Sequence, residues 1–422
     1  MHSVTNAIPT GTIASIPAKA HAHRALICAA LANSPSTILL SRTSKDIDAT
    51  MDSLRGLGAH VVYENKVVTV TPGPVPTKGN VVPHESGTTL RLLLPVAASI
   101  CNDVDVDAKG RLPDRPLEPM LGEMKAHGVI FSQDKPPFTM TGRLQGGNFS
   151  MVGDVSSQFF SGLLLAAPQI GLSTITSTTP LQSSDYVTLT TETMRDFGVE
   201  VEHTLPDTNI NEAFTVPFGA SFIGRDNYQI EGDWSNAAIW MVAAGMTGKP
   251  ITITGMNKNS VQADRRIMQV MIDAGCDVVW DGMNITVTGR ASKPIHADLE
   301  QMPDMLPVMA ALACSISGES SFIKGARLRL KESDRLIAVA NLVRDLGGTV
   351  LEEGDDLYII GSGTLKGGHG DCVNDHRLVM AGTLMALISE NPVTLQDSEA
   401  ITKSYPDFFE DWNLLGGDAH GI

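Results

Sequence analysis

The sequence predicts an α/β protein of two lobes, each built from three βαβαββ repeats, with two connecting strands that form a hinge. Three observations predict this fold class. The chain has 422 residues, enough for two or three domains of about 100–200 residues each. A helix that ends in glycine recurs about every 70 residues, and a second, alanine-rich helix recurs with the same step.

The first recurring unit is an apolar helix end, a glycine and a β-rich segment. It occurs as SLRGLGAHVV, EMKAHGVIF, TMRDFGVEV, MIDAGCDVV and LVRDLGGTV, and again near the C-terminus as EDWNLLGG. Glycine suits the left-handed residue that ends a helix before the chain turns into a strand. The six glycines, spaced by 70, 70, 77, 72 and 69 residues, are Gly58, Gly128, Gly198, Gly275, Gly347 and Gly416.

The second recurring unit is a helix of small and apolar residues. Its six copies are RALICAALA, LRLLLPVAA, FFSGLLLAAP, AIWMVAAGM, LPVMAALAC and VMAGTLMALI. Alanine-rich faces let helices pack closely, so we expect these six helices to be buried and the six glycine-ended helices to be amphipathic.

The two ends of the chain are expected to complete one another. The sixth copy has helices with no strands after them, whereas residues 1–16 read as strands with no helix before them. This pattern predicts an N-terminal lobe of residues 19–229 and a C-terminal lobe of residues 230–422 closed by residues 1–18. Two lobes joined by two strands suit closure on a ligand.

Composition excludes several classes of function. Lys and Arg number 31 against 47 Asp and Glu, a formal net charge of −16, which argues against nucleic-acid and anionic-membrane partners. No apolar run reaches the length of a membrane span, and the N-terminus lacks signal-peptide features, so we expect an unprocessed cytoplasmic protein. The five cysteines form no CxxC pair and read as core thiols rather than metal ligands or disulfides.

Charged and polar residues gather at helix starts and in the turns that precede them. Taken alone, each cluster could have a purely structural role. A pair of serines commonly caps a helix, and a run of charged residues commonly forms the solvent-exposed face of a helix. Because the clusters recur at equivalent positions of the repeat, they instead predict a basic cleft that binds small anions. Arginine side chains would bind an anion through two parallel hydrogen bonds, and lysine side chains through their single charge. No P-loop or strand-linked GxGxxG is present. The candidates are Lys19, Arg24, Gly87, Arg91, Arg115, Ser156, Ser157, Gln158, Asp304, Lys331, Glu332, Arg335, Asp375, His376, Arg377 and Lys403.

The motifs AKAHAHRAL, ESGTTLR, RLPDRPL, SSQF, SSDY, EGDWS, MPDM, LKESDR, NDHR and TKSYPDFF follow one another along the whole chain. In this order they resemble the enolpyruvyl transferase family, most closely the members that act on shikimate 3-phosphate. The resemblance implies an inside-out α/β barrel in each lobe and closure over shikimate 3-phosphate and phosphoenolpyruvate. It implies no metal or other cofactor, and we expect a monomer.

The resemblance also implies roles for individual residues. Asp304 and Glu332 would carry the proton transfers, assisted by Lys19. Phosphoenolpyruvate would be held by Lys19, Gly87, Arg115, Arg335, Arg377 and Lys403. Shikimate 3-phosphate would be held by Arg24, Ser156, Ser157, Gln158, Ser183, Tyr186, Asp304 and Lys331.

The sequence departs from the family pattern at several positions. Ala20 stands where Ser is usual, Arg327 where Asn is usual, Glu85 where Asn is common, and His21 and His23 replace a Ser-rich stretch. These changes leave open a related phosphorylated acceptor, or a non-catalytic paralogue that binds small anions.

Two further alternatives agree less well with the sequence. The sister transferase that acts on UDP-N-acetylglucosamine uses a loop Cys as acid, and the corresponding loop KGRLPDRPLEPM has none. RNA-end processing on a related repeat fold conflicts with the net charge of −16 and the 5% aromatic content.

Overall fold

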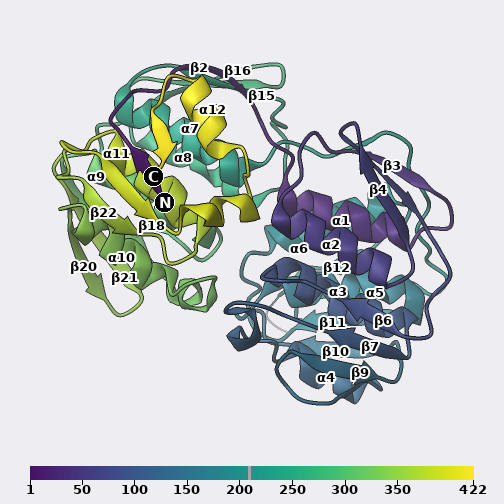
Figure 1. Cartoon of the computed structure of the whole chain (residues 1–422). Coiled ribbons are helices and arrows are strands. Elements are labelled where there is room, and N and C mark those ends of the chain that lie inside the picture. The colour runs from purple at the N-terminus through teal and green to yellow at the C-terminus, as the bar shows by residue number, and fades with distance from the viewer. Residues whose placement is uncertain (208–210) are drawn as a thin grey trace. The chain divides into compact units, whose positions relative to one another are not determined.

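The computed structural model describes residues 1–207 and 211–422, which form two compact units (Figure 1). The N-terminal unit is Pro17–Ile230, and the C-terminal unit combines Met1–Ile16 with Glu231–Ile422. Each unit contains three four-stranded sheets among its described residues. The predicted α/β class is confirmed, and the sheets stay separate, without closing into one continuous hydrogen-bonded barrel.

All three sheets of the N-terminal unit share one topology. β6 (Gly79–Val81) runs parallel to β7 (Asp103–Val106), which pairs antiparallel with β9 (Phe138–Thr141), and β8 (Ile130–Phe131) forms the edge. The parallel pair encloses a helix and the antiparallel strands form a hairpin, as the βαβαββ repeat requires. The other two sheets have the orders β10-β11-β13-β12 and β14-β3-β5-β4. Their strands are β10 (Asn148–Met151), β11 (Ser173–Ser177), β13 (Ala213–Val216), β12 (Glu202–Thr204), β14 (Tyr228–Gln229), β3 (Ser36–Leu39), β5 (Val67–Thr71) and β4 (His60–Glu64).

Three alanine-rich helices form the centre of the N-terminal unit. α1 (Lys19–Ala30), α3 (Gly87–Ile100) and α5 (Ser157–Ile170) pack against one another, and nearly all of their residues are buried. The predicted burial of these helices is therefore confirmed. The more amphipathic helices of this unit are α2 (Lys45–Gly56), α4 (Met120–Ala126) and α6 (Asp185–Asp196), and a short 3₁₀ helix, η1, spans Leu112–Asp114.

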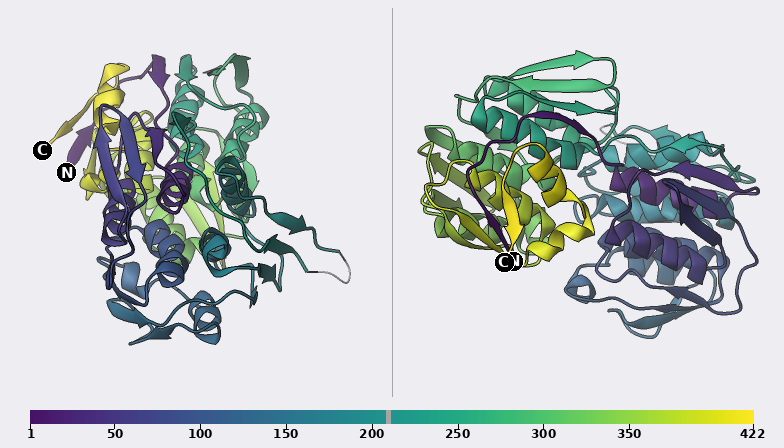
Figure 2. Two further views of the ribbon diagram at one scale, coloured as in Figure 1. Left: turned by 90° about the vertical axis from the view of Figure 1, so that its right-hand side faces the viewer. Right: turned by 45° about the horizontal axis from the view of Figure 1, so that its top comes forward.

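The C-terminal unit repeats this topology with strands from both ends of the chain. β2 (Gly11–Ala14) runs parallel to β15 (Ile251–Thr254), while β1 (His2–Val4) pairs with β23 (Val393–Gln396) and with β24 (Ala419–Gly421). The two ends thus complete one sheet, and Figure 2 shows the termini beside each other. The sheets have the orders β16-β17-β15-β2, β18-β19-β21-β20 and β22-β23-β1-β24. Their remaining strands are β16 (Asp277–Asp281), β17 (Asn284–Thr288), β18 (His296–Asp298), β19 (Gly318–Ile323), β21 (Asp356–Gly361), β20 (Thr349–Glu353) and β22 (Gly368–Asp371).

One detail of the C-terminal end was predicted wrongly. The repeat pattern left no strand after the last helix, but β24 follows it and forms the sheet edge beside β1. This strand has only three residues, too few to show a period-two pattern in the sequence.

The helices of the C-terminal unit follow the same alternation. α7 (Trp234–Thr247), α9 (Leu306–Cys314) and α11 (His376–Ala386) are almost entirely buried. The others are α8 (Ile267–Asp273), α10 (Arg335–Asp345) and α12 (Phe408–Leu414). Short 3₁₀ helices precede several of them: η2 (Ala263–Arg266), η3 (Pro303–Met305), η4 (Ala326–Leu330) and η5 (Ser398–Lys403).

The recurring glycines have the backbone conformation that the sequence predicts. The six predicted helix-ending glycines have φ between +88° and +103°, a region that residues with a Cβ rarely adopt. Each lies two residues beyond the end of its helix. This recurring φ is direct evidence for the repeat.

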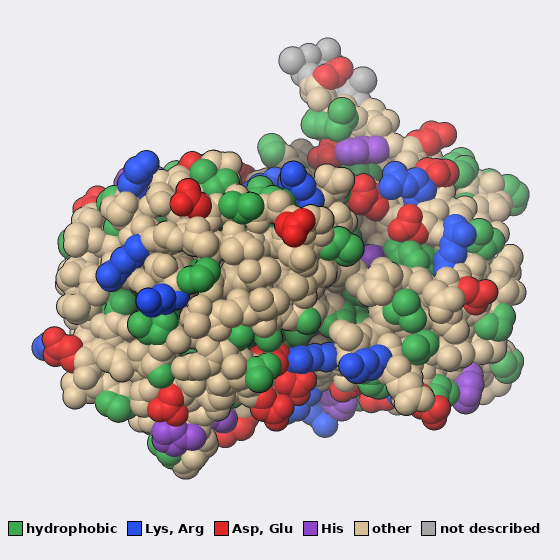
Figure 3. All heavy atoms as spheres, turned by 90° about the horizontal axis from the view of Figure 1, so that it is seen from above, with side chains coloured by type: hydrophobic (Ala, Val, Ile, Leu, Met, Phe, Trp, Pro, Cys, Tyr) green, Lys and Arg blue, Asp and Glu red, His purple; other side chains and the backbone are tan. Residues whose placement is uncertain are grey.

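Each unit has its own hydrophobic core, which its buried helices and sheet faces supply. All five cysteines are free and buried, as predicted, and burial raises the pKa of the Cys314 thiol to about 12. No helix in the described part of the chain is long and apolar enough to cross a membrane. Figure 3 shows charged side chains of both signs scattered over one face among single apolar ones.

Candidate active site

The predicted site residues fall into two groups, one in each unit. In the N-terminal unit, Lys19 is the first residue of α1, and its Nζ lies 2.7 Å from Oδ2 of Asp46 near the start of α2. Both side chains are largely buried, with 19% and 15% of their surface exposed. The pair holds the ammonium group at the head of α1, beside the first turn of α2.

Gly87 and Arg115 meet at the N-terminus of α3. A Cβ built on Gly87 would lie 2.6 Å from Nη1 of Arg115, so the guanidinium group packs directly on the glycine. Ser86 caps this helix by accepting a hydrogen bond from the backbone N–H of Thr89. The free N–H groups of a helix start, together with an arginine, form a favourable environment for an anion.

Gln158 joins the starts of α3 and α5. Its Oε1 accepts a hydrogen bond from Nη1 of Arg91 at 3.1 Å, and its Nε2 donates to Oγ1 of Thr88 at 2.9 Å. Ser156 caps α5 by accepting from the backbone N–H of Gln158, and Ser157 is the first residue of the helix. The ordinary structural role of a serine cap is therefore present at Ser156, and both serines are buried.

Arg24 is buried inside the N-terminal unit. Its guanidinium group donates to Oγ1 of Thr190 at 2.7 Å, to the carbonyl of Tyr186 at 3.0 Å and to Oγ of Ser161 at 3.3 Å. Burial lowers the pKa of Arg24 to about 10. Ser183 has a left-handed backbone with φ of +54°, and the turn that it forms leads into α6 and places Tyr186 beside Arg24.

In the C-terminal unit, Arg335 is the centre of the predicted group. This first residue of α10 is 1% exposed and contacts three carboxylates. Its Nη1 lies 2.7 Å from Asp304, its Nε 2.9 Å from Asp375 and its Nη2 2.5 Å from Glu332. Burial alone would lower the pKa of Arg335, but the three carboxylates raise it above its ordinary value.

Asp304, on η3, lies among three cations. Its Oδ1 is 3.0 Å from Nζ of Lys331 and 2.7 Å from Arg335, and its Oδ2 is 3.5 Å from Nη2 of Arg377. Burial by itself would raise the pKa of Asp304, but Lys331, Arg377 and Arg335 together outweigh burial and hold it well below its ordinary value. Burial also lowers the pKa of Lys331, against the opposing charge of Asp304.

The structure brings most of the predicted residues of this unit together. Asp304, Lys331, Glu332, Arg335 and Arg377 form one network of ion pairs, which we call the Arg335 cluster. Lys403, at the end of η5, is placed separately by a 2.8 Å hydrogen bond from its Nζ to the carbonyl of Asn374. That residue directly precedes Asp375 in the sequence. The cluster therefore offers cations for an anionic ligand and two carboxylates for proton transfer.

Comparison with known proteins agrees with this arrangement. The family model described as EPSP synthase (3-phosphoshikimate 1-carboxyvinyltransferase) matches residues 7–412. The chain belongs to the EPSP synthase family. A 3-phosphoshikimate 1-carboxyvinyltransferase from Clostridium kluyveri is 36% identical, with 97% of this chain and 95% of that protein covered. The protein of the same name from Methanocorpusculum labreanum is 34% identical, with 97% of each chain covered.

The fold agrees with a solved member of the EPSP synthase family. The structure of EPSP synthase from Acinetobacter baumannii aligns with a TM-score of 0.80 at 22% identity, covering 100% of this chain and 99% of that chain. The predicted resemblance and the two-lobe fold class are thereby confirmed.

Two carboxylates in the two groups, Asp46 and Asp264, were not among the candidates, and Asp375 was a candidate to which no role was given. Asp375 is fully buried and accepts hydrogen bonds from Arg335, from Ser333 and from the backbone N–H of Arg377. It caps α11, so an Asp before an apolar helix was the available signal. Asp46, the partner of Lys19, lies in the first turn of α2.

The second missed carboxylate is Asp264 on η2. It is 1% exposed, and its Oδ2 accepts a hydrogen bond from Oγ of Ser235. Burial raises its pKa to about 6, while the charge of Arg377 opposes the rise and that of Asp304 adds to it. Its segment does not precede one of the alanine-rich helices, so the repeat pattern did not indicate Asp264 as a site residue.

The residues that depart from the EPSP synthase pattern lie within the two groups or beside them. The carbonyl of Ala20 accepts a 2.7 Å hydrogen bond from Arg24. Arg327 is half-buried on η4, and its charge lowers the pKa of Lys331 in addition to burial. The carboxylate of Glu85 lies against Gly110, where a Cβ would come within 2.9 Å of it.

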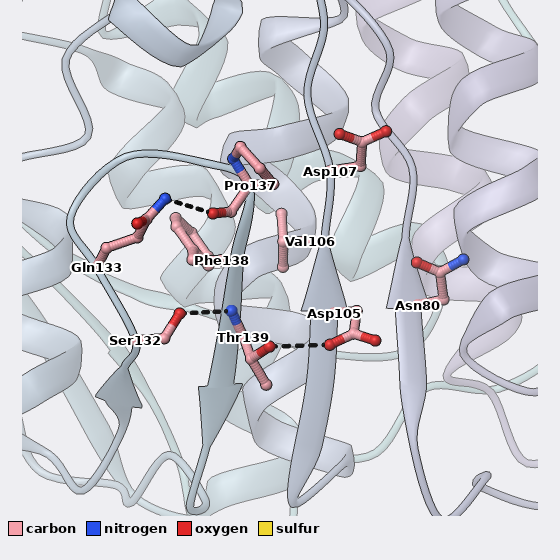
Figure 4. A pocket seen from close by; sticks show the side chains of 9 residues that line it. All are labelled: Asn80, Asp105, Val106, Asp107, Ser132, Gln133, Pro137, Phe138 and Thr139. Carbon is pink, nitrogen blue, oxygen red and sulfur yellow. Dashed lines mark hydrogen bonds between the residues drawn. The ribbon is translucent and has the colours of Figure 1, made fainter.

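Figure 4 shows a separate cavity of about 340 Å³ in the N-terminal unit, lined by residues of β6, β7 and β9 and of the turn before β9. Asp105 accepts a hydrogen bond from Thr139, and Ser132 accepts one from the backbone N–H of Thr139. None of the predicted site residues lines this cavity. Within the described residues, no group of three or more His, Cys, Asp or Glu side chains could hold a metal ion.

Proposed function

We propose that this protein transfers the enolpyruvyl group of phosphoenolpyruvate to the 5-hydroxyl of shikimate 3-phosphate and releases phosphate. Membership of the EPSP synthase family supports this reaction. The observation that carries it is the Arg335 cluster, in which Asp304 and Glu332 share a buried guanidinium group with two further cations close by. Two carboxylates among fixed cations suit a reaction that moves protons between anionic substrates.

The reaction needs two proton transfers in each of its two steps. The 5-hydroxyl oxygen adds to C2 of phosphoenolpyruvate and loses its proton, while C3 gains a proton, which gives a tetrahedral intermediate. The intermediate then loses a proton from C3, the C2–O bond to phosphate breaks, and phosphate leaves with the bridging oxygen, which takes up a proton. We assign the proton transfers to Asp304 and Glu332, with Lys19 assisting.

The cations would bind the two substrates. Phosphoenolpyruvate carries a carboxylate and a phosphate, for which Arg forks and Lys point charges are well suited. We assign its binding to Lys19, Gly87, Arg115, Arg335, Arg377 and Lys403. For shikimate 3-phosphate we assign the two serines of the α5 start to the phosphate, and the rest of the molecule to Arg24, Gln158, Ser183, Tyr186, Asp304 and Lys331.

Ala20 and Arg327 favour one alternative, a related phosphorylated acceptor. Alanine removes a hydroxyl, and arginine adds a positive charge beside Lys331, so together they change how the acceptor would be held. A non-catalytic anion-binding paralogue is the other alternative. It conflicts with the network of carboxylates and cations in the Arg335 cluster.

Steady-state release of phosphate tests the proposal. The purified protein receives phosphoenolpyruvate with shikimate 3-phosphate, with unphosphorylated shikimate, or with UDP-N-acetylglucosamine. Of the three acceptors, we expect only shikimate 3-phosphate to support turnover. The turnover number should fall by about 10²–10⁴-fold in Asp304→Asn and in Glu332→Gln. It should stay unchanged in Glu319→Gln. Glu319 is exposed on β19 and serves as the matched control. Binding of phosphoenolpyruvate without turnover of any acceptor would favour the non-catalytic alternative.

That the protein works as a cytoplasmic monomer without a nucleic-acid partner stays a prediction from its sequence.

A further inference from the structure

His23 is one of the residues that the proposed reaction does not use. It lies in α1, four residues after Lys19, and is fully buried. Its Nδ1 is 2.6 Å from Oγ1 of Thr50 in α2. Its Nε2 has no hydrogen-bond partner in the described part of the chain, so Thr50 is what orients the ring through a polar contact.

The contact with Thr50 continues as a chain of hydroxyl groups. Oγ1 of Thr50 lies 2.7 Å from Oγ1 of Thr89, which donates to Oγ of Ser86 at 2.8 Å. Thr50, Thr89 and Ser86 are all buried, with exposed fractions of 1% or less. The chain thus runs from α1 through α2 to the residue that caps α3.

The direction of the hydrogen bonds follows from counting protons. A hydroxyl group donates one hydrogen bond. The single proton of Thr89 is donated either to Ser86 or to the backbone carbonyl of Asp46, so in both cases Thr89 accepts from Thr50, and Thr50 must then accept from Nδ1–H of His23. This fixes the tautomer with the proton on Nδ1. Burial, with Lys19 and Arg24 nearby, lowers the pKa of His23 well below its ordinary value, which agrees with a neutral ring.

The same hydroxyl chain reaches the backbone of Asp46, the residue that pairs with Lys19. Oγ1 of Thr89 also lies 3.3 Å from the backbone carbonyl of Asp46, whose carboxylate holds Lys19 at 2.7 Å. Ser86 precedes Gly87, on which Arg115 packs. One buried network therefore reaches both Lys19 and the start of α3.

We propose that His23 is a positioning residue for phosphoenolpyruvate: through Thr50 and Thr89 it fixes the start of α3, with Gly87, relative to Lys19. The inference rests on the proposed function, in which Lys19 and Gly87 bind this substrate. Because His23 acts through other residues, its loss should weaken binding of phosphoenolpyruvate more than it slows turnover.

Matched variants test this role. His23→Leu removes the donor at similar size, whereas His23→Asn keeps an N–H near the position of Nδ1. Thr50→Val removes the next hydroxyl group without a change of shape. Thr193→Val is the control, because Thr193 is also buried and its hydroxyl bonds only within α6, to the carbonyl of Leu189.

We expect KM for phosphoenolpyruvate to rise about tenfold in His23→Leu and in Thr50→Val, the effect of one lost hydrogen bond. Turnover number should change by less than about twofold, and the double variant should be no worse than either single variant, because both break one chain. His23→Asn should restore most of the affinity, and Thr193→Val should leave it unchanged.

Two results would overturn the inference: folded His23→Leu with wild-type KM, or effects of His23→Leu and Thr50→Val that add. Thermal unfolding of each variant identifies those that are folded. Titration calorimetry with phosphoenolpyruvate, with and without shikimate 3-phosphate, separates this inference from the proposed function. Wild-type protein that binds but does not turn over would contradict the function alone, and the ratio of dissociation constants would then decide the role of His23.

Discussion

Nη1 of Arg335 lies 2.7 Å from Oδ1 of Asp304, and the arginine is almost completely buried. The same guanidinium group also satisfies the carboxylate of Asp375 at 2.9 Å. A buried carboxylate that loses its partner is costly, so this arginine has a structural role as well as its proposed role in the reaction.

Arg335→Met should therefore destabilise the protein by about 3–5 kcal/mol, because it leaves Asp375 without its buried counter-charge and removes one of the three cations around Asp304. Arg329→Met is the matched control. Arg329 pairs with Asp355 at 2.8 Å but is 32% exposed, so its loss should cost less than about 1 kcal/mol. Urea unfolding followed by circular dichroism measures both. Equal losses in the two variants would show that the Arg335 cluster does not stabilise the fold.

The pH dependence of turnover should report on Asp304. Lys331, Arg377 and Arg335 hold the pKa of Asp304 well below its ordinary value, in spite of burial. Bound anionic substrates would also interact with these cations and would weaken their attraction for Asp304. The pKa of Asp304 should therefore be higher in the complex than in the free enzyme. The acid limb of kcat, which reports the complex, should then lie at higher pH than that of kcat/KM, which reports the free enzyme. Coincident limbs, or the reverse order, would contradict the assignment.

Asp264 should make the protein less stable as pH rises from about 4 to about 6. Burial raises its pKa in the folded protein to about 6, so between its ordinary and its folded pKa the folded state binds more protons than the unfolded state. Below the ordinary pKa of an aspartate, Asp264 makes its full contribution to the free energy of unfolding. This contribution is lost as the pH rises through about 6. Asp264→Asn should remove this pH dependence, which amounts to a change of up to about 3 kcal/mol in the free energy of unfolding.

Thermal unfolding between pH 4 and pH 8 measures the effect of Asp264→Asn. Asp273→Asn, at an exposed position on α8, should follow the wild-type curve. A wild-type slope that persists in Asp264→Asn would assign the dependence to other groups.

The repeat made most of the fold predictable from sequence. Gly58 and the five later glycines marked where helices end, and a φ near +90° is a local property that glycine itself encodes. The place of β1 and β2 in the C-terminal unit was also foreseeable, because the N-terminal segment held strands that the last repeat lacked. The strand β24 was missed because a segment of three residues is too short to show the alternation of apolar and polar residues that indicates a strand.

The site was predictable only in part. Motifs at helix starts indicated Asp304 and Arg335, yet the side chain that joins Arg335 to the start of α11 is Asp375, 40 residues further along. The local sequence marks Asp375 as a helix start, but its contact with Arg335 depends on how the repeats pack. Asp264 was missed because its burial beside Ser235 is a tertiary property.

Gly87→Ala should weaken phosphoenolpyruvate binding about tenfold, with little change in stability. The new Cβ would lie 2.6 Å from Nη1 of Arg115, so the guanidinium group must move away from the start of α3. The loss corresponds to one charge-assisted hydrogen bond. Gly122→Ala in α4 is the control, because its Cβ would meet only the flexible end of Glu118 at 3.1 Å. Steady-state KM values compare the two, and equal KM values would show that Arg115 does not bind this substrate.

The fate of the bridging oxygen of phosphoenolpyruvate tests the proposed transfer most directly. The wild-type protein is incubated with shikimate 3-phosphate and phosphoenolpyruvate labelled with ¹⁸O between C2 and phosphorus, and the products are analysed by mass spectrometry. Enolpyruvyl transfer predicts one unlabelled enol ether of shikimate 3-phosphate for each phosphate, with the label in the phosphate. Unlabelled phosphate with labelled pyruvate, or no enol ether at all, would contradict it.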